Sequence, residues 1–307
     1  MPTIDLGVAT APPTSPSSPA SSAAEDVWAD LPRRIGLTLP ELQLLAETLG
    51  APLPFDVQAP QEATGGGLAA RLGQSVNATQ DEVYAEVLGR LGDPAEALRR
   101  RGLLTPNGVD AGVAGALGLL ATPSLALDLD VAVETRRARA WHRFRDGSVA
   151  TLATSDGLVF ELAWFAATAW PAELARVAAL PDETPVRAGL VPGRLEVPWQ
   201  VADAAAEAVR SGRPELVPVI ANDAALGTVL TALAGEARGR LRALVSAVSD
   251  EPRAIGVAAW TLLADGWHAL RPHRAGASGP DDDQLEIVRV EASDLAAELA
   301  PLLAEVA

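Results

Sequence analysis

The sequence predicts an α+β protein in which a central antiparallel β-sheet is formed from two meanders, with helical bundles beside it. The plainest signal is a segment in which apolar residues occupy every second position from Leu125 to Val133. This period of two is typical of a strand with one buried face. Short β-compatible runs and Asp-Gly pairs follow without a crossover helix. A similar order of strand, helices, meander and closing helix recurs later, which favours duplicated halves packed about a pseudo-two-fold axis.

Helices precede the first meander. The segment GLTLPELQLLAETLG predicts a short amphipathic helix with Thr38 as its N-cap, Pro40 in its first turn and Gly50 at its end. Proline and glycine residues then predict a loop, and Asp93 is expected to cap a later helix. The further helices of this half are expected over residues 79–91, 93–101 and 109–121.

The first meander runs from Ser124 to Trp164 and is expected to contain three hairpins. Two of its turns fall at Asp146-Gly147 and Asp156-Gly157, where glycine tolerates the positive φ that a two-residue hairpin requires. A helix over residues 165–180 is expected to close this half, with a kink at Trp170-Pro171.

The second half begins with a strand and a helix over residues 194–212, where Pro198 takes the place of Pro40. A further helix is expected from Asn222 or Asp223 to about residue 234, and Asp265-Gly266 is expected to form a hairpin. The last helix is expected to be capped by Ser293 or Asp294. Strands are expected over residues 238–249, 253–263, 266–272 and 284–291. Because bare strand edges invite aggregation, we expect the two meanders to join in one sheet.

The composition restricts the class of partner. The chain of 307 residues is 49% hydrophobic, contains no cysteine and carries a net charge of −16, and its 24 basic residues are all arginine. Nucleic acids and anionic lipids are held mainly by basic side chains that neutralise phosphates, so we expect neither as a partner. The absence of cysteine excludes disulfides and thiolate chemistry.

The first residues and the hydropathy pattern suggest a cytoplasmic location. The segment from residue 11 to residue 24 is rich in Pro, Ser and Ala, which predicts a disordered tail over residues 1–24. The remainder, residues 25–307, is predicted to be a single domain with halves of about 25–185 and 186–307. No signal peptide is recognised, and the longest apolar run, residues 111–127, is shorter than the roughly 20 residues that span a bilayer.

Motifs that carry chemistry are weak in this sequence. The glycines of Gly65-Gly66-Gly67 follow a proline-rich loop rather than a strand, which favours a loop over a nucleotide site. His142 and His268 each follow a tryptophan but have no second ligand nearby, so we expect surface or partly buried strand histidines. The acidic run from Asp281 to Asp283 is expected to be a solvated loop. We therefore expect no cofactor, no metal and no small-molecule substrate.

Taken together, these segments resemble the EspG family, the proteins associated with ESX, or type VII, secretion in actinobacteria. The resemblance covers about Val27 to Val306. It differs from the family in its tail and at Asp265-Gly266-Trp267, where an Asp-x-x-Gly-Arg-Tyr type of sequence is common. The matching segments are IGLTLPELQLLAETLG, LRRRGLLTPNGVDAGVAGALGLLATPSLALDLDV, RLEVPWQVADAAAEAV, TLLADGWHALRP and LEIVRVEASDLAAELAPLLAE.

The resemblance implies an EspG-like fold and a non-catalytic cytosolic chaperone or adaptor. Such a protein binds helical secretion substrates of the PE/PPE or a related type and keeps them soluble for export. Two alternatives stay open. One is a self-associating structural protein that pairs an apolar surface with a second copy. The other is an enzyme of unrecognised type, which would need a concave pocket holding a carboxylate of raised pKa.

A partner is expected on the sheet face opposite the stripe from Leu125 to Val133, because that stripe should face the helices. The neighbouring strand alternates arginine and tryptophan on one face, and this composition is typical of interface hot spots. Tryptophans of the second meander are the nearest equivalents. The alternative is that the arginines solvate an open sheet and the tryptophans pack inward. The predicted partner-binding residues are Arg137, Arg139, Trp141, Arg143, Trp260 and Trp267.

Overall fold

The computed structural model describes residues 31–55, 86, 89, 91–249, 251–274 and 283–306. The chain divides into a unit of residues 1–31 and a unit of residues 32–307, and every element below belongs to the second unit. The tail expected over residues 1–24 and most of the helix expected over 79–91 lie outside the described residues. The proposed division into halves at residues 185 and 186 stays a prediction.

The elements of the first half of the chain are β1 (Arg33–Thr38), α2 (Leu39–Leu49), α4 (Pro94–Arg100), β2 (Leu104–Thr105), β3 (Gly108–Val109), α5 (Ala111–Ala121), β4 (Leu125–Val133), β5 (Arg136–Arg145), β6 (Ser148–Thr154), β7 (Val159–Ala166), the 3-10 helix η1 (Ala167–Ala169) and α6 (Trp170–Ala178).

The elements of the second half are β8 (Arg194–Pro198), α7 (Trp199–Arg210), η2 (Pro214–Leu216), α8 (Val217–Ala221), α9 (Ala224–Gly235), β9 (Gly239–Ala247), β10 (Arg253–Leu263), β11 (Gly266–Arg274), β12 (Asp283–Val290), η4 (Ala292–Asp294) and α10 (Leu295–Ala304).

Ten strands of the described residues form one antiparallel sheet in the order β1-β7-β6-β5-β4-β9-β10-β11-β12-β8. The order is symmetric about the β4–β9 pair, because β1, β7, β6 and β5 on one side correspond to β8, β12, β11 and β10 on the other. β4 and β9 pair from Leu125 opposite Ala247 to Val133 opposite Gly239. The predicted α+β class and the joining of the two meanders are confirmed. The sheet therefore has no bare edge at its centre, where two separate meanders would each expose one.

The strand register also shows which residues of the two halves correspond. Thr38 lies opposite Val159 at the end of β1, and Pro198 lies opposite Gln284 at the end of β8. Pro198 therefore corresponds to Thr38, and the prediction that it replaces Pro40 is corrected. Both residues end an edge strand and stand at the N-cap of the helix that follows, α2 or α7.

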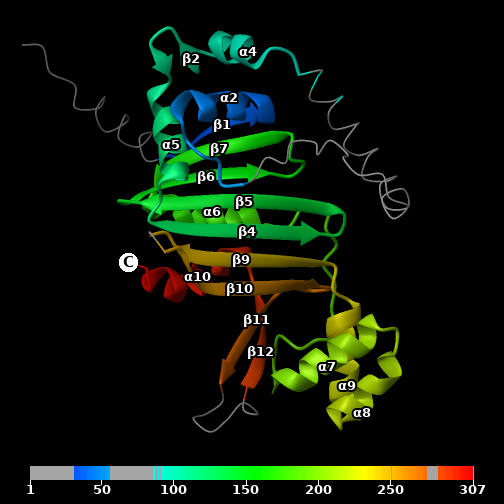
Figure 1. The fold of residues 1–307 in the computed structure, drawn as a ribbon. Helices are drawn as coiled ribbons and strands as arrows, with labels where there is room; N and C mark the ends of the chain where they lie inside the picture. Colours follow the sequence, from blue (N-terminus) through cyan, green and yellow to red (C-terminus); the bar gives the residue numbers. More distant parts are fainter. Residues whose placement is uncertain are drawn as a thin grey trace, which may run out of the picture. The chain divides into compact units, whose positions relative to one another are not determined.

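Helices cover the two faces of the sheet differently. The main core cluster lies on one face, here called the covered face, where α6 and α10 pack against the centre of the sheet. On the opposite face, α2, α4 and α5 cover the β1 end, and α7, α8 and α9 cover the β8 end. Figure 1 looks onto this second face, with β5, β4, β9 and β10 crossing the middle between the two helical clusters.

Side-chain caps account for most of the predicted helix starts. Thr38 and Glu41 form a reciprocal capping box at α2, and Gly50 ends this helix in the left-handed conformation with φ 62°. Asp93 caps α4, as predicted, and of the two residues expected at the start of α9, Asp223 is the cap. The helix expected from Val109 begins two residues later, because Asp110 caps it and residues 104–109 form a small hairpin.

Two local predictions need correction. Asp146 and Gly147 both have positive φ, as a two-residue hairpin requires, but the next hairpin has a four-residue loop, residues 155–158. There the Asp156 carboxylate accepts hydrogen bonds from the backbone N–H groups of Leu158 and Val159 at 2.8 and 3.0 Å. Pro171 lies in the first turn of α6 and makes no kink, because β7 and η1 occupy the start of the expected helix.

Candidate functional site: an open sheet face between two helical clusters

The middle of the sheet has one face that the described helices leave uncovered except along β5, which α5 contacts, and we call it the open sheet face. Figure 1 shows the four central strands β5, β4, β9 and β10 side by side, and their register shows that alternate side chains form this face. Its residues are Arg137, Arg139, Trp141, Arg143 and Arg145 of β5, Ala126, Asp128, Asp130 and Ala132 of β4, Arg240, Arg242, Leu244 and Ser246 of β9, and Val257, Ala259 and Thr261 of β10.

The alternation of β4 explains why this face is open. Its leucines and valines are buried on the covered face, and Asp128 and Asp130 therefore point to the other side. In the next strand, Leu244 lies opposite Asp128 and also opposite Val257 of β10. Leu244 is 38% exposed and Val257 is 46% exposed, so two aliphatic side chains stand side by side at the centre of the face.

Ion pairs on this face differ in how accessible they are. Arg137 and Arg139 both pair with Asp130, and their side chains are 48% and 53% exposed. Arg143 donates to Asp128 at 2.6 Å and also to the backbone carbonyl oxygen of His142 at 3.0 Å, and only 9% of its side chain is exposed. Arg137 and Arg139 are therefore paired with Asp130 but exposed at the surface of the face, whereas Arg143 is buried and holds β5 to β4.

Trp141 lies at the border between the open sheet face and the first helical cluster. Its side chain is partly buried and packs with that cluster. The ring centroid of Phe55, just after α2, lies 4.9 Å from that of Trp141, and Phe55 also stacks on Phe160 at 5.1 Å. Trp141 thus presents one part of its indole to the open face while the rest secures the helices beside it.

Trp260 and Trp267 are not on the open sheet face, and this part of the site prediction is corrected. They are 1% and 2% exposed in the main core cluster under α6 and α10. Trp267 donates through Nε1 to the carbonyl oxygen of Ala178 at 2.9 Å. The physical reason is parity, because a shift of one residue along a strand moves a side chain to the other face. The register makes Ala259 the true equivalent of Trp141.

Both strand histidines are buried, where surface or partly buried positions were expected. His142 is 1% exposed, and its Nδ1 accepts a hydrogen bond from Nε1 of Trp170 at 3.0 Å. Burial lowers the pKa of His142 to about 3, although the negative charge of Glu173 acts to raise it. His268 is fully buried beside Asp265, and burial lowers its pKa as well. Both side chains are therefore out of reach of a protein partner on the surface.

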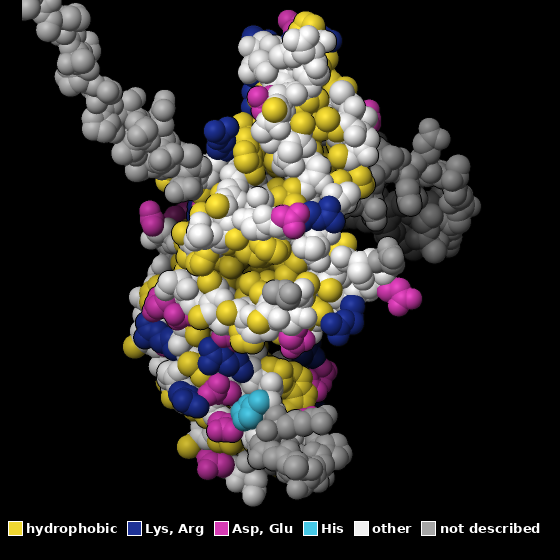
Figure 2. Space-filling view, turned by 90° about the vertical axis from the view of Figure 1, so that its left-hand side faces the viewer, with side chains coloured by type: hydrophobic (Ala, Val, Ile, Leu, Met, Phe, Trp, Pro, Cys, Tyr) yellow, Lys and Arg dark blue, Asp and Glu magenta, His cyan; other side chains and the backbone are white. Residues whose placement is uncertain are grey.

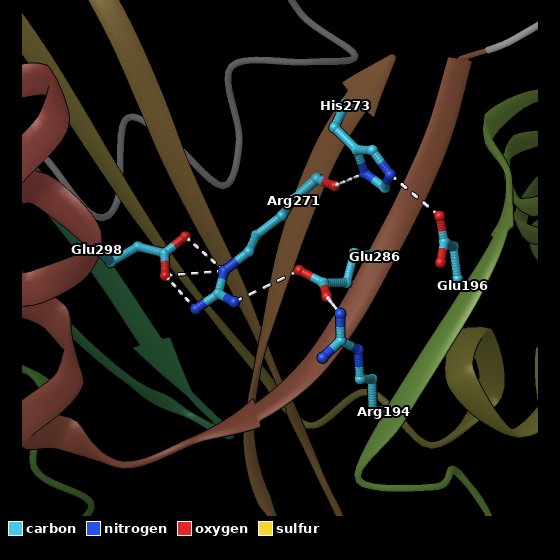
Figure 3. A network of polar contacts seen from close by, with 6 residues as sticks. All are labelled: Arg194, Glu196, Arg271, His273, Glu286 and Glu298. Atoms are coloured by element: carbon cyan, nitrogen blue, oxygen red, sulfur yellow. Dashed lines mark hydrogen bonds and ion pairs between the residues drawn. The ribbon is translucent and has the colours of Figure 1, made fainter. Parts of the chain in front are cut away.

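A network of charged side chains lies on the side of β11, β12 and β8 that faces α10 (Figure 3). Arg271 donates to Glu298 of α10 at 2.6 Å and to Glu286 of β12 at 3.4 Å. Glu286 also pairs with Arg194 of the edge strand at 2.6 Å. The hydrogen bond to Glu298 raises the pKa of Arg271. Each charge is neutralised within the network, which ties an edge strand and the last helix to the sheet.

The first half repeats this network. Arg34 of the edge strand β1 pairs with Glu161 of β7 at 3.3 Å and with Glu173 of α6. Arg176 pairs with both glutamates, at 2.6 and 3.2 Å. Burial opposes ionisation of Glu173, but hydrogen bonds from Arg34 and Arg176 outweigh it and lower the pKa. These duplicated clusters are therefore structural.

Other surfaces of the described residues offer less. Figure 2 views the molecule from the side on which α10 lies in Figure 1, and hydrophobic side chains gather across its middle. At the end of α10, the partly buried Leu302, Leu303 and Val306 pack against the main core cluster, so apolar surface there is the rim of the core. A hollow of about 400 Å³ beside α8 and α9 is lined mainly by small and apolar residues.

Two absences concern the described residues alone. None of their His, Asp or Glu side chains form a group of three or more that could hold a metal ion. None of their helices is both long enough and apolar enough to cross a membrane.

The symmetric order of the sheet, the helical cluster at each end and the open face between them define an α+β protein with an EspG-like fold. A solved structure with this fold is that of the Mycobacterium tuberculosis type VII secretion system chaperone EspG5 in complex with the PE25–PPE41 dimer. The match covers 88% of this chain and 96% of that chain, with a TM-score of 0.60 and 12% sequence identity. No protein-family model and no curated protein matches the sequence. The similarity at this identity is one of fold.

Proposed function

We propose that this protein is a non-catalytic cytoplasmic chaperone of type VII secretion, which binds helical substrates of the PE/PPE or a related type and keeps them soluble for export. The observation that carries the proposal is the open sheet face between two helical clusters, in a fold shared with a chaperone solved with a PE–PPE dimer. We place the substrate on this face, against Arg137, Arg139 and Trp141.

The chemistry of the face supports this placement. Its two exposed aliphatic side chains, Leu244 and Val257, supply apolar contact, and Arg139 and Trp141 are residue types enriched at hot spots. A specific interface buries about 800 Å² on each partner, or roughly 20 residues or more. Four neighbouring strands with 16 outward-facing residues, together with the adjoining helical clusters, are large enough for such a contact.

Co-expression tests the proposal. The full chain is co-expressed with PE/PPE-type pairs encoded in the same genome, and complexes are isolated by size-exclusion chromatography. We expect a stable complex with at least one pair. Arg139→Ala and Trp141→Ala are expected to weaken it, whereas the matched control Arg100→Ala, an exposed arginine of α4, leaves it intact.

Thermal unfolding of the same variants separates binding from folding. Loss of the complex with an unchanged unfolding temperature supports docking on this face. An unfolding temperature that falls together with binding for Trp141→Ala assigns that residue to the packing of the first helical cluster. Failure of every PE/PPE-type pair to bind the wild-type chain contradicts the proposed function.

The two alternatives lead to different results. A self-associating protein would give a concentration-dependent mass in light scattering, and a monomer at high concentration removes that alternative. The enzyme alternative required a carboxylate of raised pKa in a pocket. Among the described residues, the carboxylates whose pKa is shifted are Asp156, Glu173 and Glu183, and all three pKa values are lowered.

A further inference from the structure

We propose that the open sheet face recognises an acidic helical segment of its protein partner, and that Arg240 and Arg242 of β9 are the residues that select its carboxylates. This inference rests on the proposed function, since it names the chemistry of the substrate that docks there. Neither arginine was singled out in the sequence, because their significance depends on the neighbours that the sheet brings to them.

The charge of the open sheet face is opposite to that of the whole chain. The chain carries a net charge of −16. The four central strands nevertheless present six arginines on this face, against two aspartates, Asp128 and Asp130. A patch of opposite sign within an acidic protein attracts a partner segment that the remaining surface repels. The sign of the patch therefore points to carboxylates on the partner.

Arg240 and Arg242 are two of the three arginines of this face that form no ion pair with a described residue, the third being Arg145, which donates to the Thr122 hydroxyl. Both are exposed, and neither forms an ion pair with any residue that the structure describes. On β10, Arg242 lies opposite Ala259 and Arg240 opposite Thr261. On β4, Arg242 lies opposite Asp130, whose Oδ2 is held by two arginines of β5, while its buried Oδ1 has no hydrogen-bond partner among the described residues. Their guanidinium groups are therefore available to external carboxylates.

The spacing of the arginines suits a helix. Arg137 and Arg139 lie on β5, Arg240 and Arg242 lie on β9, and β4 runs between them. Neighbouring strands are about 4.8 Å apart, so the two pairs stand roughly 10 Å apart across the sheet. A helix with its side chains is about 10–12 Å wide. A helix laid along β4 can therefore place carboxylates toward both pairs.

The centre of the face adds an apolar requirement. Leu244 and Val257 adjoin the arginine pairs and are partly exposed, so the partner helix needs an aliphatic ridge beside its carboxylates. A nucleic acid would leave the aliphatic side chains Leu244 and Val257 without apolar contact. The composition of the face thus favours an acidic amphipathic helix over a phosphate backbone.

Two labelled peptides test the inference on the full chain. Both are 20-residue amphipathic helices with the same leucine ridge, and one carries glutamates beside it where the other carries lysines. In fluorescence anisotropy, we expect binding of the glutamate peptide at least tenfold tighter than binding of the lysine peptide. Raising the salt concentration from 50 to 500 mM is expected to weaken it at least tenfold, because exposed charges are screened.

Charge reversal locates the site. Arg240→Glu with Arg242→Glu is expected to weaken binding of the glutamate peptide at least tenfold. The matched control reverses two exposed arginines of α4, Arg99→Glu with Arg100→Glu, and is expected to keep the affinity. Circular dichroism of both variants verifies that they fold.

Three results would overturn the inference. They are equal affinity for the two peptides, equal loss of affinity in both double variants, and tighter binding of a double-stranded oligonucleotide that Arg240→Glu abolishes. A PE/PPE-type pair that still binds the Arg240→Glu and Arg242→Glu variant would keep the proposed function and remove the inference. Preference for the glutamate peptide without any PE/PPE-type complex would keep the inference and remove the function.

Discussion

In the first half of the chain, an edge-strand arginine, Arg34, meets Glu161 of the sheet and Glu173 of the closing helix. In the second half, Glu286 and Glu298 occupy the equivalent positions and are likewise joined by arginines. The residues that hold edge strand, sheet and closing helix together are thus repeated. In both halves an edge strand and a closing helix are held to the sheet, and arginine–glutamate pairs make this connection each time.

The open sheet face does not follow this repetition. Symmetry about the β4–β9 pair places Arg242 where the first half has Asp128, and Leu244 where it has Asp130. Asp128 and Asp130 pair with arginines of β5, whereas Arg242 forms no ion pair with a described residue and Leu244 is exposed. The two halves therefore share a scaffold and contribute different side chains to one surface.

The largest effect is expected from the tryptophan that the sheet buries. Trp260→Ala should lower the free energy of unfolding by about 3–5 kcal/mol, because a large side chain leaves a cavity in the main core cluster. Trp141→Ala should cost less, about 1–2 kcal/mol, because its indole is only partly buried. Urea unfolding measures both. Equal losses would mean that the two tryptophans are equally part of the core.

The repeated glutamates are expected to come next. Glu173→Gln and Glu298→Gln should each lower the free energy of unfolding by about 1–3 kcal/mol, less than for a fully buried pair because the arginine partners are partly exposed. The control Glu183→Gln removes a solvent-exposed pair with Arg136 and should change stability least. A loss in one half alone would break the structural equivalence of the two clusters.

A pH effect should distinguish His142 from its counterpart in the second half, Trp260. The pKa of His142 is about 3 in the folded chain and 6.5 for an unperturbed histidine, so the unfolded chain binds more protons between these values. Protonation of His142 therefore lowers the free energy of unfolding progressively as the pH falls from 6.5 toward 3, and has little effect above pH 6.5. Between pH 7 and pH 5 the loss from this group should be about 2 kcal/mol.

Variants at the two equivalent positions test this assignment. His142→Phe should remove that part of the decline, whereas Trp260→Phe, although destabilising, should keep it. His268, whose pKa is also lowered, leaves a smaller decline of the same sign in both variants. Urea unfolding at pH 7, 6 and 5 gives the slopes. Parallel slopes for wild type and His142→Phe would show that this histidine does not titrate as its burial requires.

The smallest effect on stability is expected on the open sheet face. Leu244→Ser and Val257→Ser should change the free energy of unfolding by no more than about 0.5 kcal/mol, because both side chains are already partly in solvent. Binding of a PE/PPE-type pair should nevertheless fall, since the aliphatic centre of the contact is lost. The same type of change in the main core cluster, Leu241→Ser, should lower the free energy of unfolding by about 2–5 kcal/mol, because it leaves a cavity. Unchanged binding by both surface variants would move the site elsewhere.

Local sequence signals were sufficient for most of the secondary structure. The alternation from Leu125 to Val133 predicted β4, and Thr38, Asp93 and Asp223 predicted the starts of three helices. These signals work because a strand period and a cap depend on residues a few positions apart. The short helix α8 was missed, since five residues are too few to show a helical period.

The candidate site was predicted in part. Arg137, Arg139 and Trp141 were placed on the face opposite the buried stripe, and the structure puts them there. Trp260 and Trp267 were placed on the same face and lie on the other. Composition indicates which residue types suit an interface, but it does not show which face of the sheet each side chain is on. For β10, this is decided by its register with β9.

The sequence by itself determined the fold class, the order of the elements, the duplicated pattern and the overall acidity, because each follows from local periodicity or composition. The tertiary structure alone decided which strands stand side by side, and hence that Arg240 and Arg242 lie across β4 from Arg137 and Arg139. About 100 residues of chain separate these two pairs. No short-range pattern can connect them, and only the pairing of β4 with β9 makes them one surface.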